Sequence, residues 1–292
     1  MDFNRYRQVL AERVGRLELP FDDAEYGRRR RGVAEAMAGA GLDALLVTDA
    51  ADICYLTGYN TFEVSVHTAL LLSAAGAAEG EGRAVLQVPS IETGPAVTTA
   101  RVDEVFGYRW EAANGAVDQM AGMIQDLRLV GSGPAGQDVA PIWPGDVGAS
   151  AGVSASAPRI GTDNWGPALR CGFRDGLAAA LPGVALVDAS GLVDGVKIVK
   201  SEPEIALLRE SARMTEMGIA AAERLIAPGV TDQQLAATGS AAMLNAGGEF
   251  MSLQPIVTAG WRSSVIHCNH QRHTVAEGDP VFLEFGAAWH RY

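Results

Sequence analysis

The stretch from Ser201 to Ile226 is the strongest helical signal in the chain and limits the possible folds more than any other segment. Ser201 and Glu204 have the spacing of a capping box, in which each side chain satisfies a free backbone N–H at the start of a helix. Apolar residues then recur three or four positions apart, which predicts a continuous buried face. The residues of this expected face are Ile205, Leu208, Ala212, Thr215, Ile219, Ala222 and Ile226.

A second helix and a set of strands follow. Thr231 and Gln234 repeat the capping-box spacing and predict a helix that ends near Leu244. From Gln254 onward the sequence alternates like strands, in PIVTA, VIHCN and PVFLEFG, with AEGD as a turn between the last two. Two helices followed by strands predict an α+β domain over residues 191–292.

Residues 1–190 have a different pattern. Apolar strands are expected at 43–48, 69–72 and 84–88, with shorter ones near 104–110 and 184–188, and helices at 22–41, 91–100 and 116–128. Alternating strands and helices predict an α/β domain. The interval 131–157 is rich in Gly, Ala, Ser and Pro and is expected to be a long loop. Arg28 to Arg31 point in different directions on a helix, so they are expected to form a solvated face.

Composition narrows the classes of function. The chain has 292 residues, an apolar fraction of 48% and a net charge of −12, which suits two globular domains and disfavours nucleic acids and membrane surfaces as partners. The sequence shows neither an apolar run long enough for a membrane helix nor a signal-peptide core, so we expect a cytoplasmic protein that binds a small molecule. The three cysteines are far apart and are expected to be reduced thiols.

The C-terminal tail contains most of the candidate chemistry. His267, His270 and His273 are spaced by three, which would gather them on a helix but not on strands and turns, so a histidine-only metal site is not favoured. His267 lies in the apolar run Val265–Cys268, where it is either a hydrogen-bonded core residue or a catalytic one.

Glu284 is the second candidate. A period of two places Phe282 and Glu284 on one face of a strand and Leu283 and Phe285 on the other. A carboxylate in such a strand suits a functional site, and the alternative is an edge-strand glutamate that faces water.

Three stretches resemble the creatinase, prolidase and methionine aminopeptidase superfamily, which has a pita-bread catalytic fold. DICYLTGYNTF is similar to a signature of its N-terminal domain, and VKSEPEIALLRESARMTEMGI to the helix that opens its catalytic domain. HCNHQRHTVAEGDPVFLEFG resembles the stretch from its active-site histidine to its first metal-ligand strand. The resemblance implies an α/β N-terminal domain with a mixed sheet and flanking helices, then the first half of a pita-bread domain.

The resemblance also assigns site residues. His267 falls on the active-site histidine, and Glu284 on the position where the peptidases have their first metal-binding aspartate. Creatinase departs at the same position and works without metal, and the glutamate strand, Arg291-Tyr292, LTGY and VHTALLL are more similar to ectoine hydrolase than to prolidase. Further expected substrate-binding residues are His67, Tyr59, Arg262 and Tyr292, and His67 has a surface-exposed edge-strand position as its alternative.

The expected function is hydrolysis of a C–N bond in a small zwitterionic or amidine-type compound, without a metal or other cofactor. The first alternative is an Xaa-Pro peptidase that uses Mn, Co or Zn, with most ligands beyond Tyr292. The second is an inactive, truncated fragment that acts only in dimerisation or binding. A homodimer is expected, in which the N-terminal domain reaches the neighbouring site. Because the resemblance ends inside the catalytic domain, the chain is expected to be truncated and unstable, aggregation-prone or dependent on a partner.

Overall fold

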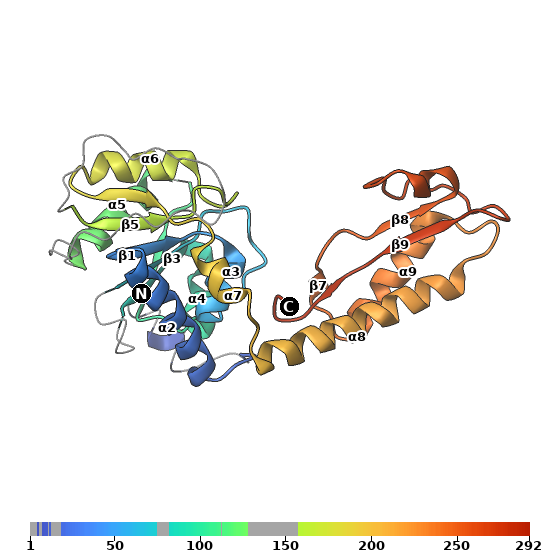
Figure 1. Cartoon of the computed structure of the whole chain (residues 1–292), viewed down its shortest axis with the longest axis horizontal. Helices are drawn as coiled ribbons and strands as arrows, with labels where there is room; N and C mark the ends of the chain where they lie inside the picture. The colour runs from blue at the N-terminus through green and yellow to red at the C-terminus, as the bar shows by residue number, and fades with distance from the viewer. Residues whose placement is uncertain are drawn as a thin grey trace. The chain divides into compact units, whose positions relative to one another are not determined.

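The computed structural model describes residues 19–74, 82–111, 113–127 and 157–292, together with 5, 8–10 and 12. It divides into two compact units, Met1–Val199 and Lys200–Tyr292 (Figure 1). The boundary predicted after residue 190 precedes helix α7 (Leu192–Lys197), which packs on α2 (Asp23–Gly39) and so belongs to the first unit. The expected loop at 131–157 lies, except for its last residue, outside the described residues.

The first unit is built around a mixed sheet with the strand order β4-β3-β2-β1-β5-β6. The strands are β1 (Ala44–Val47), β2 (Ala69–Ser73), β3 (Ala84–Pro89), β4 (Glu104–Tyr108), β5 (Arg159–Thr162) and β6 (Ala185–Asp188). β2 runs antiparallel to β1 and β3, whereas the pairs β1–β5, β3–β4 and β5–β6 are parallel.

Helices cover both faces of this sheet (Figure 1). One layer contains α2, α3 (Ala50–Thr57), α4 (Thr93–Thr99) and α7, and the other contains α5 (Ala113–Asp126) and α6 (Cys171–Ala180). Leu45 and Val47 pack into the first layer, while Ala44 and Leu46 pack into the second. Burial on both faces explains why the inner strands are continuously apolar rather than alternating.

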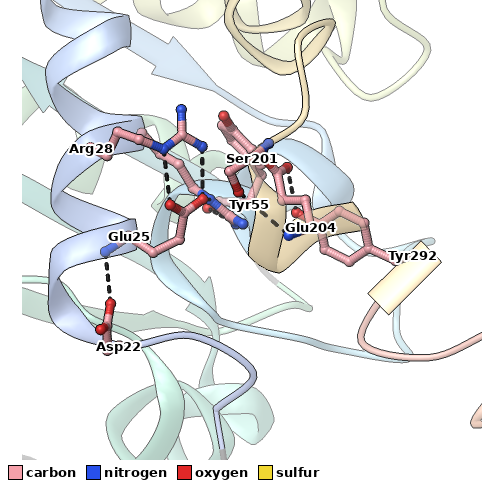
Figure 2. Close-up of polar contacts among 8 residues, drawn as sticks. Asp22, Glu25, Arg28, Tyr55, Ser201, Glu204 and Tyr292 are labelled. Atoms are coloured by element: carbon pink, nitrogen blue, oxygen red, sulfur yellow. Dashed lines mark hydrogen bonds and ion pairs between the residues drawn. The ribbon is translucent and has the colours of Figure 1, made fainter. Parts of the chain in front are cut away.

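The burial of Arg29 contradicts the expectation that Arg28 to Arg31 form a solvated face. Its side chain is 1% exposed, and its guanidinium lies over the rings of Phe21 and Tyr55, with 4.0 and 4.4 Å to the ring centroids. Glu25 accepts from Arg29 Nε at 2.9 Å. Glu25 also pairs with Arg28, as Figure 2 shows. Glu25 lies four residues before Arg29 on the same helix, but the ring of Tyr55 comes from α3, and helical spacing alone does not predict that contact.

The second unit consists of two helices packed on short strands. Its elements are α8 (Glu202–Leu225), α9 (Asp232–Asn245), β7 (Phe250–Met251), β8 (Ile256–Ala259), β9 (Val281–Glu284) and β10 (Ala287–Ala288). β8 pairs with β9 and β7 with β10, both antiparallel. The capping boxes predicted at Ser201 and Thr231 are both present.

The predicted buried face of α8 is wrong except at Ala222, which is buried. Leu208 and Ile219 are 40% and 37% exposed, and the buried face lies one position to the side. That face consists of Glu204, Leu207, Ser211, Met214, Gly218 and Ala222. The reason is close packing against α9: a Cβ atom on Gly218 would lie 3.0 Å from the carbonyl oxygen of Gly239, so small residues decide which face can pack.

Within the part of the chain that the structure describes, no helix is both long and apolar enough to span a membrane. The three cysteines are free thiols, as predicted.

Candidate active site

The β8–β9 pair has one face covered by α8 and α9 and an opposite face that is open at Phe282 and Glu284, although Thr258 on that face is buried. In its register Ile256 lies opposite Glu284, and Val257 lies opposite Leu283. Val257 and Leu283 pack in the core with α8 and α9, whereas the Glu284 side chain is exposed on the other face. Phe282 shares that open face and is 42% exposed. The period-two prediction for this strand is therefore confirmed. Among the described residues β9 pairs only with β8, so the exposed Glu284 has the geometry of the alternative, an edge-strand glutamate that faces water.

The segment between these strands does not form the predicted strand VIHCN, residues 265–269. Instead a 3-10 helix, η3 (Gly260–Ser264), follows β8 directly and is succeeded by a turn. Ser263 Oγ donates to the carbonyl oxygens of Thr258 at 3.0 Å and Pro280 at 3.1 Å, which folds the chain back on itself. Alternation of apolar residues cannot predict this, because the turn depends on contacts with residues distant in sequence.

Residues 265–273, here called the histidine loop, follow η3. Val265 and Ile266 are 49% and 87% exposed, and the His267 side chain is exposed as well, so His267 is not a core histidine. Its backbone has φ 57°, in the left-handed region that non-glycine residues seldom occupy. Such conformations cluster at functional sites, where surrounding contacts maintain them.

Two side chains anchor the histidine loop. Arg262 donates from Nη2 to the carbonyl oxygen of Asn269. At the other end, the carboxylate of Asp232 accepts from the backbone N–H of Gln271 at 3.1 Å and of His273 at 2.9 Å. Sequence reasoning missed Asp232, for which the only signal was an acidic residue directly after a helix cap. Arg262, expected to bind substrate, is here part of the loop's own support.

His67 lies in the core of the first unit and not on an edge strand, because it precedes β2 inside the sheet. It is 9% exposed, and its ring packs against that of Phe173, with centroids 3.9 Å apart and planes tilted by 40°. Its Nε2 lies 3.3 Å from Oε1 of Gln87, whose amide nitrogen donates to Ala116 O, so the imidazole proton is assigned to Nε2. Burial, with a smaller effect of the Arg170 charge, lowers the pKa of His67 to about 4 against the raising effect of the Gln87 hydrogen bond.

The two candidate tyrosines also have partners in the structure. Tyr59 is 1% exposed and donates to Oε2 of the buried Glu92 at 2.7 Å. Tyr292 donates to Oε1 of Glu204 at 2.8 Å (Figure 2). His267, Arg262, Glu284 and Tyr292 thus belong to the second unit, and His67 and Tyr59 to the first. Within the described residues, no hydrogen bond or ion pair joins His267 to Glu284.

A complete metal centre is not present in the described part of the chain. No group of three or more His, Cys, Asp or Glu side chains lies close enough there to hold a metal ion. Glu284 offers one carboxylate on an open face, whereas protein metal sites use several side-chain ligands.

Comparisons with known proteins agree with this architecture. The model of the creatinase/prolidase N-terminal domain matches residues 29–199, and that of metallopeptidase family M24 matches residues 206–292. The chain is 29% identical to the probable dipeptidase PepE of Mycobacterium tuberculosis, over 92% of the chain and 61% of that protein. It is 23% identical to the ectoine hydrolase of Halomonas elongata, over 94% of the chain and 65% of that protein.

Among solved structures, the Xaa-Pro dipeptidase from Bacillus anthracis is similar with a TM-score of 0.67 and 19% identity, over 90% of the chain and 61% of that structure. The predicted fold class, an α/β N-terminal domain followed by an α+β pita-bread domain, is confirmed. The chain spans 61 to 65% of the length of these three proteins.

The match to a metallopeptidase family corrects one expectation. We predicted a site that works without a cofactor, but the family that matches residues 206–292 is a family of metal-dependent enzymes. The prediction failed because it took the glutamate at position 284 as a sign of a metal-free branch, although a glutamate carboxylate is itself a good metal ligand.

Proposed function

Because the chain belongs to the creatinase/prolidase family, we propose that the protein is a hydrolase that cleaves a C–N bond in a small zwitterionic compound. The observation that carries this proposal is the open face of β8–β9, where the Glu284 carboxylate is exposed. The 3-10 helix η3 packs on both strands and leads directly into the histidine loop. A carboxylate and an accessible imidazole are the groups that such a hydrolysis needs.

Charge favours a substrate with a positive group. Glu284 accepts hydrogen bonds when ionised and attracts a cationic group. The chain as a whole has a net charge of −12, which also attracts cations. One relative is named for the hydrolysis of ectoine and another for that of dipeptides. Both names are compatible with a small zwitterion as the substrate of this chain.

The proposed reaction uses His267 to move a proton. Water adds through its oxygen to the carbon of the C–N bond and gives a proton to the imidazole of His267. The C–N bond then breaks, and His267 returns the proton to the leaving nitrogen. Glu284 holds the substrate cation or the water in place. General acid–base catalysis of this kind contributes about 10²- to 10⁴-fold, and orientation of the reactants adds more.

A divalent metal is implied by the matched family, yet the described residues do not fit one on their own. The proposed steps therefore involve only the side chains of His267 and Glu284. Under this proposal the roles of His267 and Glu284 are tested both with and without added metal.

A second candidate is a metal-dependent Xaa-Pro peptidase in which Glu284 is a metal ligand. Two observations favour it, namely the metallopeptidase match over residues 206–292 and the 29% identity to a probable dipeptidase. In this case Glu284 binds the metal directly and does not contact the substrate cation.

One experiment separates the two candidates. The protein is stripped of metal and assayed with ectoine, creatine and an Xaa-Pro dipeptide, each with and without Mn²⁺, Co²⁺ or Zn²⁺. Turnover of ectoine or creatine supports the first candidate. Turnover of the dipeptide alone, with metal bound by the wild type and not by Glu284→Gln, supports the second. Absence of turnover with every compound and metal contradicts both and favours a role in binding or assembly.

We further propose that the protein is a homodimer. Its two copies would associate through the loops at one end of the strands of the first unit's sheet. The register places the ends of β1, β3 and β4 and the start of β2 at the same edge of the sheet. Loops at this edge expose large apolar side chains, namely Phe62 (91%), Val64 (64%), Ile91 (67%), Trp110 (55%) and, after β5, Trp165 (71%). Exposed apolar residues gathered in this way mark interaction surfaces.

A further inference from the structure

Asp232 is the first residue of α9, yet it is fully buried, with 0% exposure. Aspartates at the start of a helix normally face water, because burying a carboxylate is costly unless hydrogen bonds satisfy it. Here those hydrogen bonds come from residues far along the chain: Oδ2 accepts from Gln271 N at 3.1 Å and Oδ1 from His273 N at 2.9 Å.

The Asp232 carboxylate is not needed to cap its own helix. The N-cap of α9 is Thr231, whose hydroxyl accepts from Gln234 N at 3.2 Å. Gln234 in turn accepts from Thr231 N at 2.9 Å, which completes the capping box. The side chain of Asp232 is therefore committed to the histidine loop.

Backbone hydrogen bonds join the start of α9 to the end of the histidine loop. Val275 N donates to Val230 O at 2.8 Å, and Asp232 N donates to His273 O at 2.9 Å, with a bridge between Thr231 and Thr274. This short ladder ends at His273. The two bonds of the Asp232 carboxylate extend the connection further into the histidine loop, as far as Gln271.

The loop also holds backbone conformations that need outside support. His267 has φ 57° and Arg272 has φ 63°, and Arg272 lies between the two N–H groups that Asp232 binds. Left-handed conformations of non-glycine residues cost of order 1–3 kcal/mol and persist only where neighbouring contacts impose them. Asp232 supplies such contacts.

We propose that Asp232 is a positioning residue, whose carboxylate fixes the conformation of the histidine loop and thereby the place of His267. The inference rests on the proposed function for the catalytic importance of His267. That Asp232 holds the histidine loop in its conformation does not depend on which reaction the protein catalyses.

Asp232→Asn tests the inference because it keeps the shape of the side chain but replaces one acceptor oxygen with an NH₂ group, which cannot accept from a backbone N–H. Thr231→Ala is the matched control, because it weakens the cap of the same helix and leaves both bonds to the loop intact. Both variants are compared with the wild type by NMR of ¹³C-labelled histidine side chains, by thermal unfolding and by kcat and KM.

We expect Asp232→Asn to shift the imidazole signals of His267, His270 and His273, while those of His67 and His290 stay in place. On a substrate of the protein, kcat falls about tenfold or more, and KM changes less than twofold, because misplacing a reacting group reduces catalysis more than binding. Thr231→Ala lowers the melting temperature without shifting the loop signals.

Unchanged histidine-loop signals in Asp232→Asn, or equal shifts in Thr231→Ala, overturn the inference. If the signals shift as expected but the wild type hydrolyses none of the compounds, the inference holds and the proposed function fails. If Asp232→Asn does not fold, Asp232→Glu replaces it, since Glu keeps both acceptors but displaces them by one methylene. Asp232→Glu is expected to shift the same three signals, and unchanged signals overturn the inference.

Discussion

The hydroxyl of Tyr292 donates a hydrogen bond to Oε1 of Glu204 at 2.8 Å, and Oε2 of the same carboxylate accepts from Ser201 N at 2.8 Å. Glu204 is 1% exposed, so its carboxylate depends on these partners for the hydrogen bonds that water would otherwise supply. Tyr292, which was expected to bind substrate, is thus hydrogen-bonded to the carboxylate that caps α8.

We expect Tyr292→Phe to lower the free energy of unfolding by about 2 kcal/mol, because a hydrogen bond to a buried charged group is lost. Urea denaturation followed by circular dichroism measures this. Ser201→Ala, which weakens the same cap, is expected to cost about 1 kcal/mol. An unchanged unfolding midpoint together with a raised KM would instead show that Tyr292 binds substrate.

The depressed pKa of His67 makes the stability of the first unit dependent on pH. Its folded-state pKa of about 4 lies below the ordinary value of 6.5, so the unfolded chain takes up the proton first. The stabilisation that the neutral, buried imidazole of His67 gives to the folded state is fully present above about pH 6.5 and is lost as the pH falls toward 4. The loss is on the order of 3 kcal/mol.

Urea denaturation at several pH values, for the wild type and for His67→Gln, measures this contribution. The difference between the two unfolding free energies is expected to shrink or reverse in favour of the variant as the pH falls, because Gln does not titrate. Parallel curves for the two proteins between pH 7 and 4 would contradict the assignment.

The space around two helical glycines predicts opposite effects on stability when each is replaced by alanine. A Cβ atom on Gly218 would lie 2.6 Å from Met243 Cγ, whereas one on Gly122 in α5 would meet nothing within 4 Å. Gly218→Ala should destabilise the second unit by about 1–3 kcal/mol. Gly122→Ala should stabilise the first by about 0.5–1 kcal/mol, because alanine loses less entropy in a helix. Thermal unfolding of both variants checks the signs, and a stabilising Gly218→Ala would show that the helices are further apart.

Removing apolar side chains from the exposed edge of the first unit should weaken the proposed dimer. We expect Phe62→Ser/Trp165→Ser to shift the mass measured by sedimentation velocity from dimer to monomer, because large apolar side chains contribute most to such interfaces. Trp261→Ser is the control, since Trp261 is 68% exposed in the second unit. A wild-type protein that sediments as a monomer at micromolar concentration would contradict the proposal.

Local patterns predicted much of this fold. The apolar runs at 43–48 and 84–88 correspond to β1 and β3, both capping boxes open helices, and period two identified the open face that carries Glu284. These features depend on residues near one another in sequence, whose spacing alone determines the direction in which each side chain points.

The failures occurred where distant segments decide the outcome. The buried face of α8 is selected by the small residues through which it approaches α9. Arg29, which pairs with Glu25 on its own helix, is buried because the ring of Tyr55 from α3 covers its guanidinium. The histidine loop is a turn and not a strand because Asp232 and Arg262 bind its backbone. A sequence pattern contains no information about such partners, which are fixed only by tertiary packing.

If Glu284 and His267 carry out the hydrolysis, the value of kcat/KM for Glu284→Gln and His267→Gln on the best substrate found must fall. Glu277→Gln, at an exposed turn before β9, and His273→Gln are the matched controls. We predict at least a 100-fold loss for each site variant in the presence of added Mn²⁺, and less than a twofold change for each control. Site variants that retain activity within twofold of the wild type would contradict the claim.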